Sequence, residues 1–205
     1  MDSNITGVEG LRSDENVTPS GGTVTIEERT VEAGDLEFSI STSPSARVIE
    51  DDEDDIVLAR FNFDTTASGE DVELESFEAQ VNVDVSGASP AISAVDAVER
   101  LTNCRIYDED GNDLELDEDV DGNDATTGVV ADGTLGSTPF AFDFDFDDDL
   151  LLENDTVTEL ELRCDIGSVA NGVEYQWEVV ASSDVDAEGV ETNNDITVSL
   201  SLIHI

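Results

Sequence analysis

One stretch of the sequence alternates aromatic residues with small or acidic ones at a strict period of two. Residues 140–146 read Phe-Ala-Phe-Asp-Phe-Asp-Phe, and three aspartates, Asp147–Asp149, follow them. A β-strand would present all four rings on one face and Asp143 and Asp145 on the other, whereas a helix would spread the rings around its axis. The sequence therefore predicts a central core strand whose two aspartates face salt water or a metal ion, followed by an acidic turn.

Aliphatic residues repeat this alternation along most of the chain. The other segments with strand character are 23–31, 35–41, 56–63, 72–85, 101–107, 114–116, 126–130, 150–166, 173–182 and 195–199. A skipped position in the fourth of these predicts a β-bulge at residues 75–76, and residues 86–97 are expected to form a loop or a short helical crossover. The sequence thus predicts an all-β fold, an antiparallel β-sandwich of about ten short strands.

Acidic residues outnumber basic ones by 52 to 7, all seven basic residues are arginines, and the formal net charge is -45. High charge with few aromatic residues can indicate disorder, but here the acids alternate with apolar residues and do not form a tail. So negative a surface excludes nucleic-acid binding and disfavours binding to anionic membranes. It fits very salty surroundings or abundant divalent cations, because about 1 M salt shortens the screening length to about 3 Å. The composition resembles that of proteins from halophiles.

Both ends of the sequence are expected to be cut from a longer protein. Residues 1–22 show no periodicity and are interpreted as a linker or the end of a preceding module, with the β-sandwich module at 23–199. Residues 200–205 resemble the translation of a sequencing adapter and are expected to be a non-native tail; an ordinary apolar strand end is the alternative. The sequence shows neither a signal peptide nor an apolar run long enough for membrane insertion.

Several segments resemble the β-sandwich modules that occur in tandem in large bacterial and archaeal cell-surface and S-layer-like proteins. The similarity lies in the strand rhythm and apolar residues of 56–63, 67–74, 104–108 and 160–166, and it extends over about residues 35–190. It implies an immunoglobulin-like sandwich, secretion to the cell surface and a structural role, with neighbouring modules of the same or identical chains as partners. The acidity, the two cysteines and an Asp-rich insertion at 108–124 depart from the pattern.

The two cysteines, Cys104 and Cys164, are each in phase with core-facing neighbours. If their strands are adjacent, a disulfide is feasible and would stabilise the fold by roughly 4 kcal/mol, because it closes a long loop. Two buried free thiols are the alternative. Two cysteines and one histidine disfavour a metal site of the zinc type. A disulfide would indicate an extracellular location.

Residues 108–113, Asp-Glu-Asp-Gly-Asn-Asp, resemble the beginning of a calcium loop, in which alternate carboxylate and amide side chains surround one ion. The candidate Ca²⁺ ligands are Asp108, Asp110, Asn112 and Asp119. The glycine stands fourth instead of sixth, and Asp119 replaces the usual bidentate glutamate. A hairpin turn explains the same residues, and segment 119–124 has the same two interpretations.

Two further sets of residues are candidates for binding or modification. Tyr175 and Trp177 alternate with valines, so their rings either belong to the core or form an exposed platform for stacking sugars. Asn4, Asn16 and Asn154 each begin an Asn-X-Thr glycosylation acceptor, in agreement with a surface location.

The sequence contains no recognisable catalytic constellation. With 52 acidic residues, some carboxylate pair falls at glycosidase spacing by chance and carries no information, and no nucleophile-elbow or phosphate-binding glycine motif appears. The favoured function is a non-catalytic structural or spacer module of an extracellular surface-layer, stalk or adhesin-type protein adapted to high salt. The alternative is a carbohydrate-binding module that uses Tyr175 and Trp177, and an enzyme ranks third.

Overall fold

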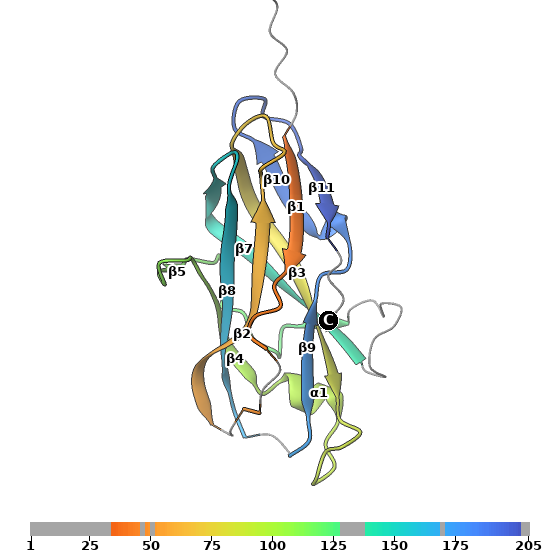
Figure 1. Ribbon diagram of the computed structural model, residues 1–205. Coiled ribbons are helices and arrows are strands. Elements are labelled where there is room, and N and C mark those ends of the chain that lie inside the picture. The colour runs from red at the N-terminus through yellow and green to blue at the C-terminus, as the bar shows by residue number, and fades with distance from the viewer. Residues whose placement is uncertain (1–33, 46–47, 50–51, 128–137, 169–170, 202–205) are drawn as a thin grey trace, which may run out of the picture. The chain divides into compact units, whose positions relative to one another are not determined.

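Figure 1 shows the computed structural model of the chain, which describes residues 34–45, 48–49, 52–127, 138–168 and 171–201. All of them belong to the second of two units of the chain, Val31–Ile205. The predicted linker at 1–22, the predicted strand at 23–31 and residues 202–205 lie outside the described residues.

The described residues form two β-sheets packed face to face (Figure 1). In spatial order the first sheet contains β11 (Thr197–Leu200), β1 (Asp35–Ile40), β2 (Glu53–Asp64), β8 (Val157–Ile166), β4 (Leu101–Tyr107) and β5 (Asp113–Leu114). The second contains β10 (Val185–Gly189), β3 (Val72–Asp84), β7 (Thr138–Leu152) and β6 (Thr126–Thr127), and β9 (Glu174–Glu178) pairs with the other end of β3. The predicted all-β sandwich is confirmed.

All strand pairs of these two sheets are antiparallel except one, in which β1 runs parallel to β11. The described helices are α1 (Ala94–Val98), which begins in the region expected to be a loop or helical crossover and ends one residue beyond it, and the 3-10 turn η1 (Ser182–Asp184). No helix in the described part of the chain has the length and apolar character needed to cross a membrane.

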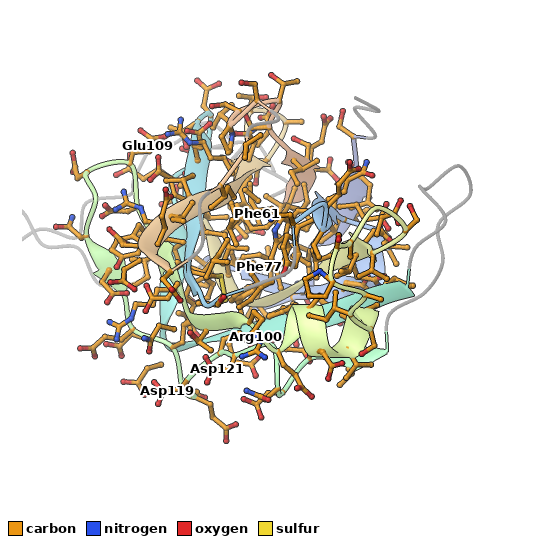
Figure 2. The ribbon with its side chains drawn as sticks, turned by 90° about the horizontal axis from the view of Figure 1, so that it is seen from below. Phe61, Phe77, Arg100, Glu109, Asp119 and Asp121 are labelled. Atoms are coloured by element: carbon orange, nitrogen blue, oxygen red, sulfur yellow. A yellow bond between two sulfur atoms is a disulfide. The ribbon has the colours of Figure 1, made fainter. Side chains whose placement is uncertain are left out.

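The phenylalanine strand lies in the core, as predicted. All four of its rings are at most 6% exposed, whereas Asp143 and Asp145 face solvent. Phe77 of β3 joins the two sheets: its ring centroid lies 5.0 Å from that of Phe144 in its own sheet and 5.1 Å from that of Phe61 in the facing sheet (Figure 2). Such ring pairs each add about 0.5–1.5 kcal/mol beyond the burial of apolar area.

The acidic turn expected at Asp147–Asp149 is wrong, because β7 continues through these residues to Leu152. The strand continues because the insertion between β5 and β6 pairs with it. The backbone N–H of Asp147 donates to the Glu115 carbonyl oxygen at 3.1 Å, and that of Asp117 donates to the Asp145 carbonyl oxygen at 3.0 Å. The Asp-rich insertion thus pairs with β7 of the second sheet at residues 115–117 and returns to β4 of the first sheet at Val120.

The β-bulge predicted at residues 75–76 is present in β3 against β10, because Ser76 pairs with Asp186 and Leu74 with Ala187, which leaves Glu75 as the extra residue. A second irregularity lies between β3 and β7. Leu74 pairs with Leu150 and Ser76 with Asp145. Two steps along β3 correspond to five along β7, so on this side the extra residues belong to the acidic stretch of β7.

Candidate functional site

The two aromatic residues considered for sugar stacking lie on β9 and face the core. Trp177 is 8% exposed, and its ring packs against that of Phe142 with centroids 5.1 Å apart. The Tyr175 hydroxyl donates a hydrogen bond to the Ala97 carbonyl oxygen at the end of α1, at 2.8 Å, and burial raises the pKa of Tyr175 to about 12. The predicted ligand-binding platform is therefore wrong, because pairing with β3 turns both rings inward.

Three of the predicted calcium ligands lie in a hairpin turn between β4 and β5. Asp108 accepts hydrogen bonds from the backbone N–H groups of Asp110 at 3.0 Å and Asn112 at 2.8 Å. The side-chain amide of Asn112 donates a further bond at 2.8 Å and is the first of the causes that lower the pKa of Asp108. Gly111, with φ of +81°, supplies the left-handed conformation that the turn needs. The hairpin interpretation accounts for all of these contacts.

Asp119, the fourth predicted ligand, lies away from this turn. Its neighbour Val120 pairs with Cys104 of β4. Asp108 follows Cys104 by four residues along the chain, which corresponds to about 13 Å at 3.3 Å per strand residue. Figure 2 shows Glu109 near the top of the view and Asp119 near its bottom. Within the described ranges no group of three or more His, Cys, Asp or Glu side chains is arranged to hold a metal ion. Calcium binding stays a prediction.

The second Asp-Gly-Asn turn, at residues 121–123, packs against the end of α1. The backbone N–H of Gly122 donates to the Leu101 carbonyl oxygen at 2.7 Å, and a Cβ on Gly122 would lie 1.8 Å from the Val98 carbonyl oxygen. The Asp121 side chain accepts the backbone N–H of Asn103 at 2.7 Å. The glycine is needed for close approach of two backbones, so packing explains this turn without an ion.

Cys104 of β4 and Cys164 of β8 lie on adjacent strands, with Cα atoms 4.1 Å apart, and form a disulfide. Both are at most 2% exposed. The strands shift register beside Cys104, where Asn103 has a φ of +49°. The predicted pairing is confirmed, and the alternative of two free thiols is wrong.

Of the three predicted glycosylation acceptors, Asn154 is the one among the described residues; Asn4 and Asn16 lie outside them. Asn154 is exposed in the turn between β7 and β8, and its backbone N–H donates to the Asp71 carboxylate at 2.8 Å. Its exposure leaves the acceptor accessible, and its modification stays a prediction.

An acidic groove of about 260 Å³ lies on the outer face of the second sheet, between β7 and the η1–β10 segment. Its lining consists of Ser76, Phe77, Glu78, Asp143, Asp145, Ser183, Asp184, Val185 and Asp186. Loss of hydration, together with the charges of Asp145 and Asp184, raises the pKa of Asp143. Burial likewise raises the pKa of Glu78, against a hydrogen bond from Gln80 that lowers it. The groove is thus a place of mutual repulsion among carboxylates.

A buried carboxylate that the sequence analysis did not single out lies at one end of the sandwich. Glu70, in the connection between β2 and β3, is 2% exposed. Its oxygens accept the backbone N–H groups of Glu191 at 2.8 Å and Thr192 at 2.9 Å, and the Thr192 hydroxyl at 2.7 Å. Burial raises the pKa of Glu70, but these bonds and one from the Gly34 backbone outweigh it and leave the pKa below its usual value.

The position of Glu70 explains why the neighbouring strand β10 ends in a glycine. A Cβ on Gly189, the last residue of β10, would lie 2.3 Å from the Glu70 Oε1 atom. Glu70 therefore fastens three segments together: the residue that precedes β1, the connection between β2 and β3, and the turn between β10 and β11. No motif marks it, because its partners Glu191 and Thr192 lie more than 100 residues away along the chain.

Arginines neutralise part of the outer face of the first sheet. Arg60 pairs with Glu159 at 3.1 Å and also with Glu161. Arg163 pairs with the same Glu161 at 2.6 Å, and its guanidinium carbon lies 4.3 Å from the centroid of the Tyr107 ring. One carboxylate thus bridges two arginines on neighbouring strands, and the several N–H donors of the guanidinium let Arg60 reach two glutamates at once.

No family model, curated protein or solved structure matches this chain. The contacts described above bind the chain to itself: two hairpin turns, a disulfide, a buried carboxylate clamp and a network of ion pairs.

Proposed function

We propose that the chain is a non-catalytic, tension-resisting spacer module of an extracellular surface-layer, stalk or adhesin-type protein, with an immunoglobulin-like sandwich adapted to concentrated salt. The observation that carries this proposal is the parallel pairing of β1 with β11, in which Asp35 lies opposite Thr197 and Phe38 opposite Leu200. These are the first and last strands of the described body. A chain that continues at both ends would pull them in opposite directions along their own axes.

The direction of that pull decides how the hydrogen bonds fail. The evenly spaced bonds of a parallel pair lie across the strands, so opposite forces along the strands load all of them together and do not open them one by one. Both ends of the pair are also fastened beyond the strands. The Gly34 backbone bonds to Glu70 before β1, and the Ser201 backbone N–H donates to the Phe38 carbonyl oxygen at 3.1 Å after β11.

Two further observations support an extracellular location in salt. A buried disulfide is typical of oxidising compartments. The net charge of -45 makes a compact body that repels itself unless the surrounding ions screen it.

Single-molecule force measurements on two full chains joined head to tail test the proposal. With handles at the two ends of the fusion, the unfolding force should be high and each chain should unfold in a discrete step, because forced unfolding reports the barrier to unfolding. In the control, one handle stays at the N-terminal end and the other is placed at Thr66, in the turn next to Glu70. Because β1 and β2 are antiparallel, with Glu37 opposite Asp64, the force then peels β1 away from β2. An equal or lower force in the head-to-tail geometry than in this control would contradict the proposal.

A further inference from the structure

The last described segment, residues 190–201, contains no fully buried residue. We call this segment the strap; it comprises the turn after β10 and strand β11, and each of its residues is half-buried or exposed. In contrast, β2, β3, β7 and β8 each bury at least four side chains. Because local stability follows the buried apolar contacts of a segment, the strap is one of the parts of the described sandwich that open at low cost, and it is the one that contains a strand of the β1–β11 pair.

One buried group holds the strap in place. The Glu70 carboxylate accepts three hydrogen bonds from Glu191 and Thr192, at 2.7–2.9 Å. Bonds to an ionised acceptor are roughly twice as strong as neutral ones. A backbone bond from Val190 to the Asp71 carbonyl oxygen, at 3.0 Å, lies beside them. The strap is therefore held at its first turn by a carboxylate and along β11 by its pairing with β1.

We propose that Glu70 is a latch for the strap. While its carboxylate holds Glu191 and Thr192, β11 stays paired with β1. When these bonds are lost, the strap opens as a local unit and the two sheets remain packed, because Ile196, Val198 and Leu200 of the strap only border the core and every fully buried core residue lies outside it.

This inference deepens the proposed function and takes its biological meaning from it. Since β11 is one of the two strands under tension, the latch would set the force at which the pair separates. Twelve residues, 190–201, extend to about 40 Å at 3.3 Å per residue. An opened strap would lengthen the module by up to that distance before the sheets unfold.

Amide hydrogen exchange on the full chain in molar NaCl tests the latch without applied force. In Glu70→Gln, which keeps the size of the side chain and removes its charge, exchange in the strap should accelerate by about tenfold or more, while β7 and β8 keep their rates. Gly189→Ala should act in the same direction, since its Cβ would lie 2.3 Å from the Glu70 Oε1 atom. The matched control is Glu73→Gln, which removes an equal charge from β3 outside the latch.

Two outcomes would overturn the latch. Equal acceleration in the strap and in β7 and β8 would make Glu70 an ordinary contributor to global stability, and unchanged exchange in the strap would show that other contacts hold it. If Glu70→Gln does not fold, Thr192→Val removes a single donor and no charge, and it should still accelerate exchange in the strap alone. The force measurement tests the spacer function and exchange tests the latch, so each can fail without the other.

Discussion

The disulfide between Cys104 and Cys164 closes a long loop in the unfolded chain, and the length of this loop sets the contribution of the disulfide to the free energy of unfolding. Replacing Cys104 and Cys164 together by alanine removes the covalent link between β4 and β8 and keeps both positions apolar. The link joins residues 60 apart in sequence, for which the chain-entropy relation gives about 14 cal/mol/K, or about 4 kcal/mol at 25 °C. We therefore expect the free energy of unfolding to fall by about 4 kcal/mol, a large share of the roughly 5–15 kcal/mol that stabilises a typical domain.

Thermal unfolding in about 2 M NaCl, a concentration at which charge repulsion is screened, measures this loss. For a domain of this size, 1 kcal/mol corresponds to roughly 2–4 °C in Tm, so the double variant should melt about 8–16 °C below the natural chain. Reductant strong enough to open the buried disulfide should lower the Tm of the natural chain by a similar amount and leave the variant unchanged. A loss below about 1 kcal/mol would refute the entropic argument, since the bond would then constrain nothing in the unfolded chain.

Three other predictions concern charge and packing. The free energy of unfolding should rise by several kcal/mol from millimolar to molar NaCl, because about 3 Å screening removes the repulsion; a flat Tm would contradict the salt adaptation. At low salt, stability should rise as the pH falls from neutral through the raised pKa of Asp143, because the repulsion from its carboxylate is fully present only above that pKa; Asp143→Asn should reduce this rise. Below about pH 4 the sign reverses, because the lowered pKa of Glu70 means that its stabilisation is lost as it protonates. Tyr175→Phe should cost about 0.5–1.5 kcal/mol through the lost bond to Ala97, measured by urea unfolding.

The sequence predicted those strands in which the alternation of apolar and polar residues is clear within the strand itself. The alternating phenylalanines of β7 and the valines of β3 need no information from elsewhere, because a period of two with large side chains specifies a buried face. Strand β10, Val185–Gly189, was missed because it buries only Val185, Ala187 and Gly189 between acids, and such small side chains give a weak pattern.

The features that were wrong or missed depend on partners distant in sequence. Asp147–Asp149 resembles a turn, and only pairing with residues 115–117 keeps it in a strand. The alternation of Tyr175 and Trp177 with their neighbours is the same whether their rings form a surface platform or belong to the core. Only the register of β9 against β3 decides which face of the sheet the two rings occupy. Glu70 is one acid among 52, and its role follows from a turn that lies 121 residues further along the chain.

The distribution of arginine indicates where the predicted dependence on salt would originate. On the first sheet, Arg60, Arg105 and Arg163 each pair with a carboxylate of the same face. The described strands of the second sheet, β3, β6, β7, β9 and β10, contain no basic residue, and the carboxylates with raised pKa values, Glu75, Glu78 and Asp143, all lie on that sheet. Surface ion pairs contribute little stability individually, but they spare the first sheet from repulsion that the second sheet can relieve only through protonation or through bound or screening ions. We therefore expect the predicted dependence of stability on salt to originate on one face of the sandwich, and loss of salt should loosen the η1–β10 segment along the acidic groove before it affects the arginine-paired sheet.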